Sequence, residues 1–362
     1  MARVLFFLVL SSLFFACESV DNLSNQPEFQ KRTIKGTAQG TTYSIVYYSD
    51  SSIAKEDIDS ILTAIDYSLS NWNKESLLSR FNAGEDSILL DEFFETNLTT
   101  SWLIYEATNG AFNPLVKPLI DYYGLGSKST KTLNIDSARV LEIKLLLDMN
   151  AIVLKDLTAK ITIENRISSS AKGNLLLLQS KPGLQLDFNA IAQGYSVDVV
   201  AEFLSASGIT NFLVEIGGEM YASGAHPTGK SWLAGIDKPE ENMDARTLQA
   251  KLELKNEAIA TSGNYRKFAL IDGRKVHHTI NPNTGYPAIN SILSATVISS
   301  NCTSADAYAT AFMVMGLERS KQFLTSDKGK DLKAFFIFTG PNDEYLYYYS
   351  KGLKEKLEIL SN

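Results

Sequence analysis

The sequence predicts an α+β fold with mainly antiparallel sheets and separately packed helices. Strand-like segments occur in pairs joined by turn residues, as in KFALI and RKVHHTI on either side of Asp272-Gly273, a strong hairpin signal. Helical periodicity occurs in a few segments, and strands and helices do not alternate regularly as they do in a doubly wound parallel sheet. The 362 residues, 44% hydrophobic and 21% charged, are enough for a substantial globular core.

The N-terminus is typical of a secretory signal. After a basic start, residues 4–16 form an apolar run that is too short to span a bilayer as a mature helix. The run ends in a small residue before Cys17, which resembles the lipobox of bacterial lipoproteins, although Phe14 stands where leucine is usual. We expect a signal peptide at 1–16, a lipidated Cys17 and a linker at 17–32, with an uncleaved anchor or plain secretion as alternatives. The protein would then be lipid-anchored in a bacterial cell envelope, on the periplasmic side of the inner or outer membrane.

The first half of the mature chain mixes strands and helices. Residues 33–48 alternate and are rich in Thr, Ile, Val and Tyr around two glycines, which predicts a pair of strands. Apolar side chains recur at helical spacing over 58–69 and 94–105, and the second helix is predicted to stop at Asn109-Gly110. A further helix is predicted near 137–147, with strand-like pieces after it.

The second half has sharper signals. Residues 184–188 are predicted to form a strand, and Asn189 to cap a helix that ends at Gly208. With Cys17 lipidated, Cys302 has no disulfide partner, and we expect it to be buried at a strand end. The remaining predicted elements are strands at 211–216, 219–224 and 292–299, a helix over 305–315, and a hairpin from 333 to 350. No linker divides residues 33–362, so we expect one catalytic unit.

The charge balance excludes some classes of partner. The net charge is −7 and no run of Lys and Arg occurs, so we expect no nucleic acid. A phosphate-bearing ligand would need backbone amides, a few placed side chains or a cation. The sequence contains no GxGxxG, GxxxxGK[ST], HExxH or GxSxG motif, which leaves dinucleotide folds, phosphate loops, zincins and α/β-hydrolases without support.

The segment SADAYATAF (304–312) carries a candidate cation site. Asp306 and Thr310 are four residues apart, so a helix places both oxygen side chains on one face, a spacing that suits a hard cation. A structural interpretation is open too, since an acid in a first turn favours the helix dipole and a mid-helix Thr often bonds to a carbonyl one turn earlier. The alanines of this segment would let the helix approach its neighbours closely.

Other polar residues are unexpected for packing alone. GAFNP (110–114) opens a loop after a helix, and Asp187 precedes 189–194, a predicted helix start where free amides favour an anion. Gly217-Gly218 admits a ligand close to the backbone or simply makes a tight turn. Further candidates are Thr261-Ser262-Gly263 with Arg266 as a phosphate site, and His277-His278 before a turn at 281–285.

Taken in order, these motifs resemble the ApbE-type FAD:protein FMN transferases over nearly all of residues 33–350. They are GTTY (40–43), SNWNKESLLSRFN (70–82), GAFNP (110–114), LDFNAIAQGYSVD (186–198), EIGGE (215–219), TSGNYR (261–266), HTINPNTG (278–285) and SADAYAT (304–310).

The resemblance implies a T-fold-related architecture and a Mg²⁺-dependent transfer of FMN from FAD to a Thr or Ser hydroxyl of a partner protein, with release of AMP. The partner would be an exported or membrane redox protein. The cation would be held by the Ala190 carbonyl and the side chains of Asp306 and Thr310. His278 would accept the proton of the incoming hydroxyl. The positions that correspond to FAD contacts are Gln39, Trp72, Ala111, Phe112, Asn113, Asp187, Gln193, Ser262 and His278.

Three positions depart from the family pattern. Gln193 replaces a frequent Lys, Asn113 a frequent Asp, and Gln39 a frequent Met. These changes concern flavin affinity more than the cation. Two alternative functions stay open, a metal-dependent FAD pyrophosphatase that yields FMN and AMP, and a non-catalytic FAD-binding lipoprotein.

Overall fold

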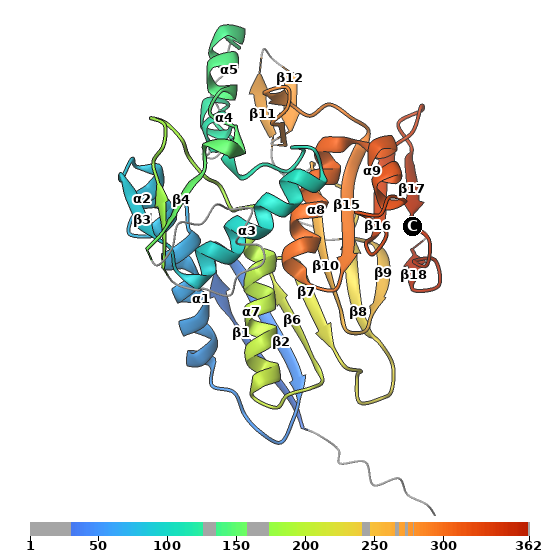
Figure 1. Ribbon diagram of the computed structural model, residues 1–362. Coiled ribbons are helices and arrows are strands. Elements are labelled where there is room, and N and C mark those ends of the chain that lie inside the picture. The colour runs from blue at the N-terminus through green and yellow to red at the C-terminus, as the bar shows by residue number, and fades with distance from the viewer. Residues whose placement is uncertain are drawn as a thin grey trace, which may run out of the picture.

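The computed structural model describes residues 30–125, 135–157, 174–240, 247–264, 268–271, 274–277 and 279–360. Its largest sheet has eight strands in the order β1-β2-β6-β7-β10-β15-β16-β17, and each neighbouring pair is antiparallel (Figure 1). These strands are β1 (Lys31–Ala38), β2 (Thr41–Tyr48), β6 (Phe212–Ile216), β7 (Glu219–Ser223), β10 (Glu257–Gly263), β15 (Ile292–Ser299), β16 (Lys333–Thr339) and β17 (Tyr345–Tyr349).

Helices cover one face of this sheet (Figure 1). α1 (Lys55–Leu69) contacts β1, α7 (Ala192–Ala206) contacts β6 and β7, and α8 (Cys302–Met315) contacts β7, β10 and β15. α9 (Leu317–Leu324) follows α8 and contacts β16. Four alanines of α8 are fully buried: Ala305, Ala307, Ala309 and Ala311. Their small side chains let the helix lie close to the sheet and to α7, as predicted.

A smaller sheet, ordered β18-β9-β8, covers the opposite face. Adjacent residues of a strand point to opposite faces, so Phe336 joins the core beneath α8 and Phe335 packs against the smaller sheet with Trp232. The molecule therefore has a layer of helices, the large sheet and the small sheet. The strands of the small sheet are β8 (Trp232–Asp237), β9 (Leu248–Leu254) and β18 (Leu357–Ile359).

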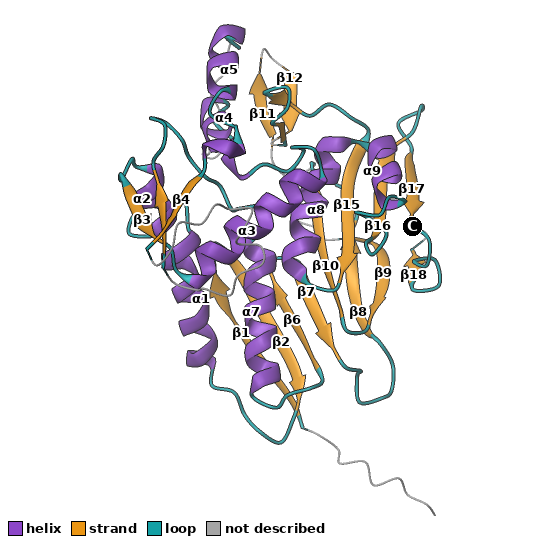
Figure 2. Cartoon of the chain, in the orientation of Figure 1, coloured by secondary structure: helices purple, strands orange, loops and turns teal. Residues whose placement is uncertain are grey.

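Further elements surround the end of the layered part where α3 crosses α8. The elements from α2 to β5, together with β13 and β14, share a core with the start of α7 and with Ala307 and Ala311 of α8. Figure 2 shows α4 and α5 beyond one end of the large sheet, near the β11–β12 hairpin. These elements are α2 (Leu77–Asn82), β3 (Ser87–Leu89), α3 (Glu92–Ala107), the 3₁₀ turn η1 (Pro114–Val116), α4 (Lys117–Tyr122), α5 (Ser137–Lys144), the 3₁₀ turn η2 (Met149–Ala151), β4 (Val153–Asp156), β5 (Leu175–Leu178), and the short pairs β11 (Phe268–Ile271) with β12 (Arg274–His277) and β13 (Ile280–Asn281) with β14 (Tyr286–Pro287).

The predicted fold class is confirmed, and so are the strand pair over 33–48 and the end of α7 just before Gly208. β11 and β12 form an antiparallel pair, as predicted, and the two turn residues between them lie outside the described residues. The helix predicted near 137–147 ends earlier, at Lys144. Gly217 and Gly218 have φ values of 66° and 117°, so the tight-turn interpretation of this pair holds.

The strand predicted at 184–188 is wrong. This segment is buried, but its backbone bonds to groups that belong to no strand. Leu186 N–H donates to the side-chain oxygen of Asn82 (2.7 Å), and Asp187 N–H donates to the Pro114 carbonyl (2.7 Å). Asn189 does not cap α7 either, because the helix begins three residues later, at Ala192. The side-chain amide of Asn189 instead contacts Asp187.

The start of α8 also differs from the prediction. The helix begins at Cys302, three residues earlier than expected, because the side chain of Asn301 accepts a hydrogen bond from Ser304 N–H (2.8 Å) and caps it. Cys302 is buried as predicted, but in a helix and not at a strand end. Asp306 consequently lies beyond the first turn, where the helix dipole gives it little stabilisation.

The N-terminal predictions lie outside the described residues. The signal peptide, Cys17 and most of the linker precede residue 30. Within the part of the chain that the structure describes, no helix is both long and apolar enough to span a bilayer.

Candidate active site

α7 and α8 touch at Gly194, and this contact places Asp306. A Cβ atom on Gly194 would lie 2.3 Å from the Cys302 carbonyl oxygen and 2.9 Å from the Asp306 Cβ. Only glycine allows this approach, and it brings the Gly194 amide within 3.1 Å of Asp306 Oδ2, to which it donates. The carboxylate is thereby oriented by the free amide of a helix start.

Asp306 is buried, with 6% of its surface exposed. Burial raises the pKa of its carboxyl from 3.8 to about 7, the Gly194 hydrogen bond opposes this shift, and the charge of Asp198 adds to it. A carboxylate in such a place is costly when it is unpaired, and a bound cation would remove the cost. The site therefore has the electrostatics of a cation ligand.

Thr310 and Ser262 meet beside Asp306. Thr310 follows Asp306 by one turn of α8, and its hydroxyl lies 3.0 Å from the hydroxyl of Ser262 on β10. The structure thus brings together three residues that the sequence placed in two separate motifs. The result is one carboxylate and two hydroxyls at the junction of α7, α8 and β10.

Asp198 is a functional candidate that the sequence analysis did not single out. It lies on α7 and accepts hydrogen bonds from Cys302 N–H (2.7 Å), Thr303 N–H (2.8 Å) and the Thr303 hydroxyl (2.5 Å). It therefore caps α8 from another helix. Its only sequence signal was its place at the end of GYSVD, because a cap supplied by a distant residue has no local spacing.

Glu219, the first residue of β7, was also missed. Only 8% of its surface is exposed, and its Oε2 is fully buried without a hydrogen-bond partner. Burial and then the charge of Asp306 raise the pKa of this carboxyl well above its ordinary value.

Two glutamines approach the start of α7. Gln39 has a φ of 52° in the β1–β2 turn, and its Nε2 donates to the Ser196 hydroxyl (2.6 Å). The side chain of Gln193 lies against Gly217, where a Cβ atom would come within 2.3 Å of Gln193 Nε2. Both predicted flavin positions are therefore held by polar or backbone contacts at one helix end.

Asn113 and Asp187 lie close to each other through Pro114, whose carbonyl accepts from Asp187 N–H. The side chain of Asn113 is used internally, since Oδ1 accepts from Leu115 N–H (2.8 Å) and Nδ2 donates to the Leu147 carbonyl (2.9 Å). Asp187 is buried, its Oδ1 accepts from Asn189 N–H (2.7 Å), and burial raises the pKa of its carboxyl.

The remaining predicted residues differ in exposure. Ala111 and Phe112 are buried and Ala190 is half-buried, whereas Trp72 is 73% exposed in the loop after α1. A ring with this exposure is free to stack on a ligand, as its predicted flavin contact requires. His278 and Arg266 lie outside the described residues, so their roles stay predictions.

Comparison with known proteins assigns the family. Residues 39–336 match the sequence model of the ApbE family. The chain belongs to this family. A relative named FAD:protein FMN transferase from Vibrio cholerae is 34% identical over 297 residues, which cover 79% of this chain and 82% of that protein. A protein of the same name from Escherichia coli K12 is 27% identical over 357 residues, 97% of this chain and 96% of that one.

Solved ApbE structures have the same fold. The flavin transferase ApbE from Vibrio cholerae superposes with a TM-score of 0.74 at 29% identity, covering 91% of this chain and 99% of that one. The apo form of the Pseudomonas stutzeri flavinyl transferase ApbE also gives 0.74, at 27% identity, over 91% and 97% of the two chains. These matches confirm the family resemblance and the fold predicted from the sequence motifs.

The donor set of this ApbE chain fits a hard cation. Within the described residues, no three His, Cys, Asp or Glu side chains are grouped so as to hold a metal ion. Mg²⁺ takes oxygen ligands and keeps several waters. One buried carboxylate with neighbouring hydroxyls suits that preference.

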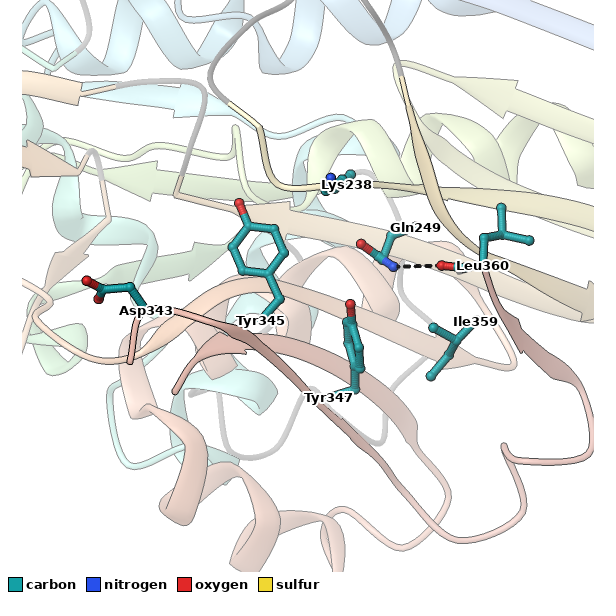
Figure 3. Close-up of a pocket in the computed structure, with 7 residues that line it drawn as sticks. All are labelled: Lys238, Gln249, Asp343, Tyr345, Tyr347, Ile359 and Leu360. Atoms are coloured by element: carbon teal, nitrogen blue, oxygen red, sulfur yellow. Dashed lines mark hydrogen bonds between the residues drawn. The ribbon is translucent and has the colours of Figure 1, made fainter. Parts of the chain in front are cut away.

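A cavity of about 630 Å³ lies away from these residues (Figure 3). It is formed between β17, β9 and the end of the chain, and Gln249 Nε2 donates to the Leu360 carbonyl at its edge (3.3 Å). None of the predicted site residues that the structure describes lines this cavity. Its lining residues are Lys238, Gln249, Asp343, Tyr345, Tyr347, Ile359 and Leu360.

Proposed function

We propose that this chain transfers the FMN moiety of FAD to a Thr or Ser hydroxyl of a partner protein and releases AMP. The observation that carries the proposal is the meeting of Asp306, Thr310 and Ser262 at the start of α7, in a chain of the ApbE family. The relatives named above are FAD:protein FMN transferases, which supports the same reaction here.

The reaction needs one bond to form and one to break. The acceptor oxygen forms a bond to the phosphorus of the FMN moiety, and the bond between that phosphorus and the bridging oxygen breaks as AMP leaves. The hydroxyl proton must go to a base, and His278 is our candidate because imidazole titrates near neutral pH.

The cation of this reaction would be Mg²⁺, held by the Ala190 carbonyl, Asp306 and Thr310. When bound, it would supply Lewis-acid stabilisation of the charge that develops on the phosphate oxygens. The chain's own residues hold these ligands in place, since Gly194 N–H donates to Asp306 and the Ser262 hydroxyl contacts Thr310. The positive end of the α7 dipole would favour the negatively charged pyrophosphate.

The flavin would lie against the loop residues of the predicted set. Trp72 offers an exposed ring, and Gln39 and Gln193 offer amide groups at the same helix end. The remaining contacts that we propose are Ala111, Phe112, Asn113, Asp187 and Ser262. The protein would be anchored through lipidated Cys17 in the bacterial envelope, so the acceptor would be an exported or membrane redox protein.

The test is to incubate the purified protein with FAD, MgCl₂ and a candidate acceptor. We expect AMP in solution and flavin phosphate on the acceptor by mass spectrometry, and we expect both to disappear with EDTA or in Asp306→Ala. Glu202→Ala is a matched control, because it removes an exposed acid from α7. Free FMN without acceptor labelling would instead identify an FAD pyrophosphatase, and bound FAD without any AMP would identify a binding protein.

A further inference from the structure

We propose that Glu219 is a second carboxylate of the cation site, which adds negative charge beside Asp306 and raises the affinity for a divalent cation. The inference rests on the proposed function and deepens it. It concerns a residue outside the ligand set that the family resemblance implied, namely Ala190, Asp306 and Thr310.

The fold brings Glu219 under the start of α8. Glu219 pairs with Ile216 across the Gly217-Gly218 turn, and β7 contacts both α7 and α8. The Cys302 thiol, four residues before Asp306, donates to the carbonyl of Ile259 (3.7 Å), which pairs with Met220, the residue after Glu219. Cys302 and Asp306 therefore share the face of α8 that rests on the sheet at β7 and β10. The charge of Glu219 acts on Cys302, and the charge of Asp306 acts on Glu219.

No cationic side chain compensates Glu219 within the described residues. Its Oε2 is buried without a hydrogen-bond partner, and its polar contact is with its own backbone amide. The acids that surround it are Asp306 and Glu215. Glu257 on the neighbouring strand β10 shows the usual arrangement, because Lys333 (2.6 Å) and Lys356 (2.7 Å) both donate to it.

Two neighbouring buried carboxylates without a counter-charge are unfavourable, and glutamate is rarely buried unless it is paired. A divalent cation would compensate both charges at once. The alternative is that Glu219 is a neutral, space-filling acid. The two interpretations differ in their response to Glu219→Gln, which keeps the shape and removes the charge.

The experiment measures Mn²⁺ binding to the full-length protein by the EPR signal of free Mn²⁺, so it requires neither FAD nor turnover. Glu219→Gln should raise the Mn²⁺ dissociation constant roughly 10- to 100-fold, as loss of residues around metal ligands does. Asp306→Asn should weaken binding at least as much. Glu257→Gln is the control: it also removes a charge from a partly buried strand glutamate, and it should leave Mn²⁺ affinity unchanged.

The outcomes separate this inference from the proposed function. Wild-type Mn²⁺ affinity in Glu219→Gln, with binding lost in Asp306→Asn, overturns the role of Glu219 and leaves the cation site intact. Unchanged affinity in Asp306→Asn, or no Mn²⁺ binding by the wild type, overturns the cation site itself. If Glu219→Gln does not fold, Glu219→Asp decides, because it keeps the charge: it should bind Mn²⁺ within about tenfold of the wild type, and a greater loss overturns the inference.

Discussion

The contact between α7 and α8 predicts that Gly194→Ala damages the site more than the fold. The added methyl would meet backbone atoms, the Cys302 carbonyl oxygen at 2.3 Å and its carbon at 2.7 Å. No side-chain rotation relieves such a contact. The helices must therefore separate, and Asp306 moves with α8.

The size of this movement follows from the contact. An ordinary contact begins at 3.4 Å, so the 2.3 Å approach requires a local separation of about 1.1 Å. Overpacking of this kind costs about 1–3 kcal/mol of stability, and the better helix propensity of alanine returns up to about 1 kcal/mol. A displacement of about 1 Å in a catalytic group lowers the rate roughly 100-fold.

The assay compares thermal unfolding and AMP release for the wild type, Gly194→Ala and Glu202→Ala, whose substitution is on the exposed side of α7. We expect Gly194→Ala to stay folded and slightly less stable, with AMP release reduced roughly 100-fold, and Glu202→Ala to resemble the wild type. AMP release by Gly194→Ala within about threefold of the wild type would refute the view that this close approach positions Asp306.

Three further predictions concern the groups around this contact. In EDTA, the stability of the protein should fall as the pH rises from about 4 to 7. The reason is that the unfolded chain releases the Asp306 proton near pH 3.8, whereas the folded chain releases it only near pH 7. Asp306→Asn should flatten this dependence when thermal unfolding is measured across that range. Asp198→Ala should cost about 2–3 kcal/mol in urea unfolding, since it removes three charge-assisted hydrogen bonds to Cys302 and Thr303, and a cost below about 0.5 kcal/mol would contradict the cap. Asn113→Asp should destabilise by about 1–3 kcal/mol, because a carboxylate cannot donate to the Leu147 carbonyl, and a variant as stable as the wild type would show that this bond is dispensable.

Much of the site was predictable where the chemistry lies within one element. Asp306 and Thr310 share a helix face because they are four residues apart, and the alanines around them predicted the close packing of α8. Ser262 was predictable only through the ordered motifs, because its contact with Thr310 joins residues far apart in the chain.

The rest depends on tertiary structure. Residues 184–188 alternate like a strand, but their amides bond to Asn82 and Pro114, and no sequence period records such partners. Asp198 caps a helix that begins more than a hundred residues later, and Glu219 stands out only through its buried Oε2, which has no hydrogen-bond partner. Local patterns predict elements, whereas these roles arise when elements meet.

The most direct test of the account is the position of Mn²⁺ in a crystal of the protein soaked with Mn²⁺ and FAD, located by anomalous scattering. We predict a peak bounded by the Asp306 carboxylate, the Thr310 hydroxyl and the Ala190 carbonyl, in contact with the FAD pyrophosphate. A peak elsewhere, with these three groups free of metal while FAD is bound, would contradict the assignment of the site.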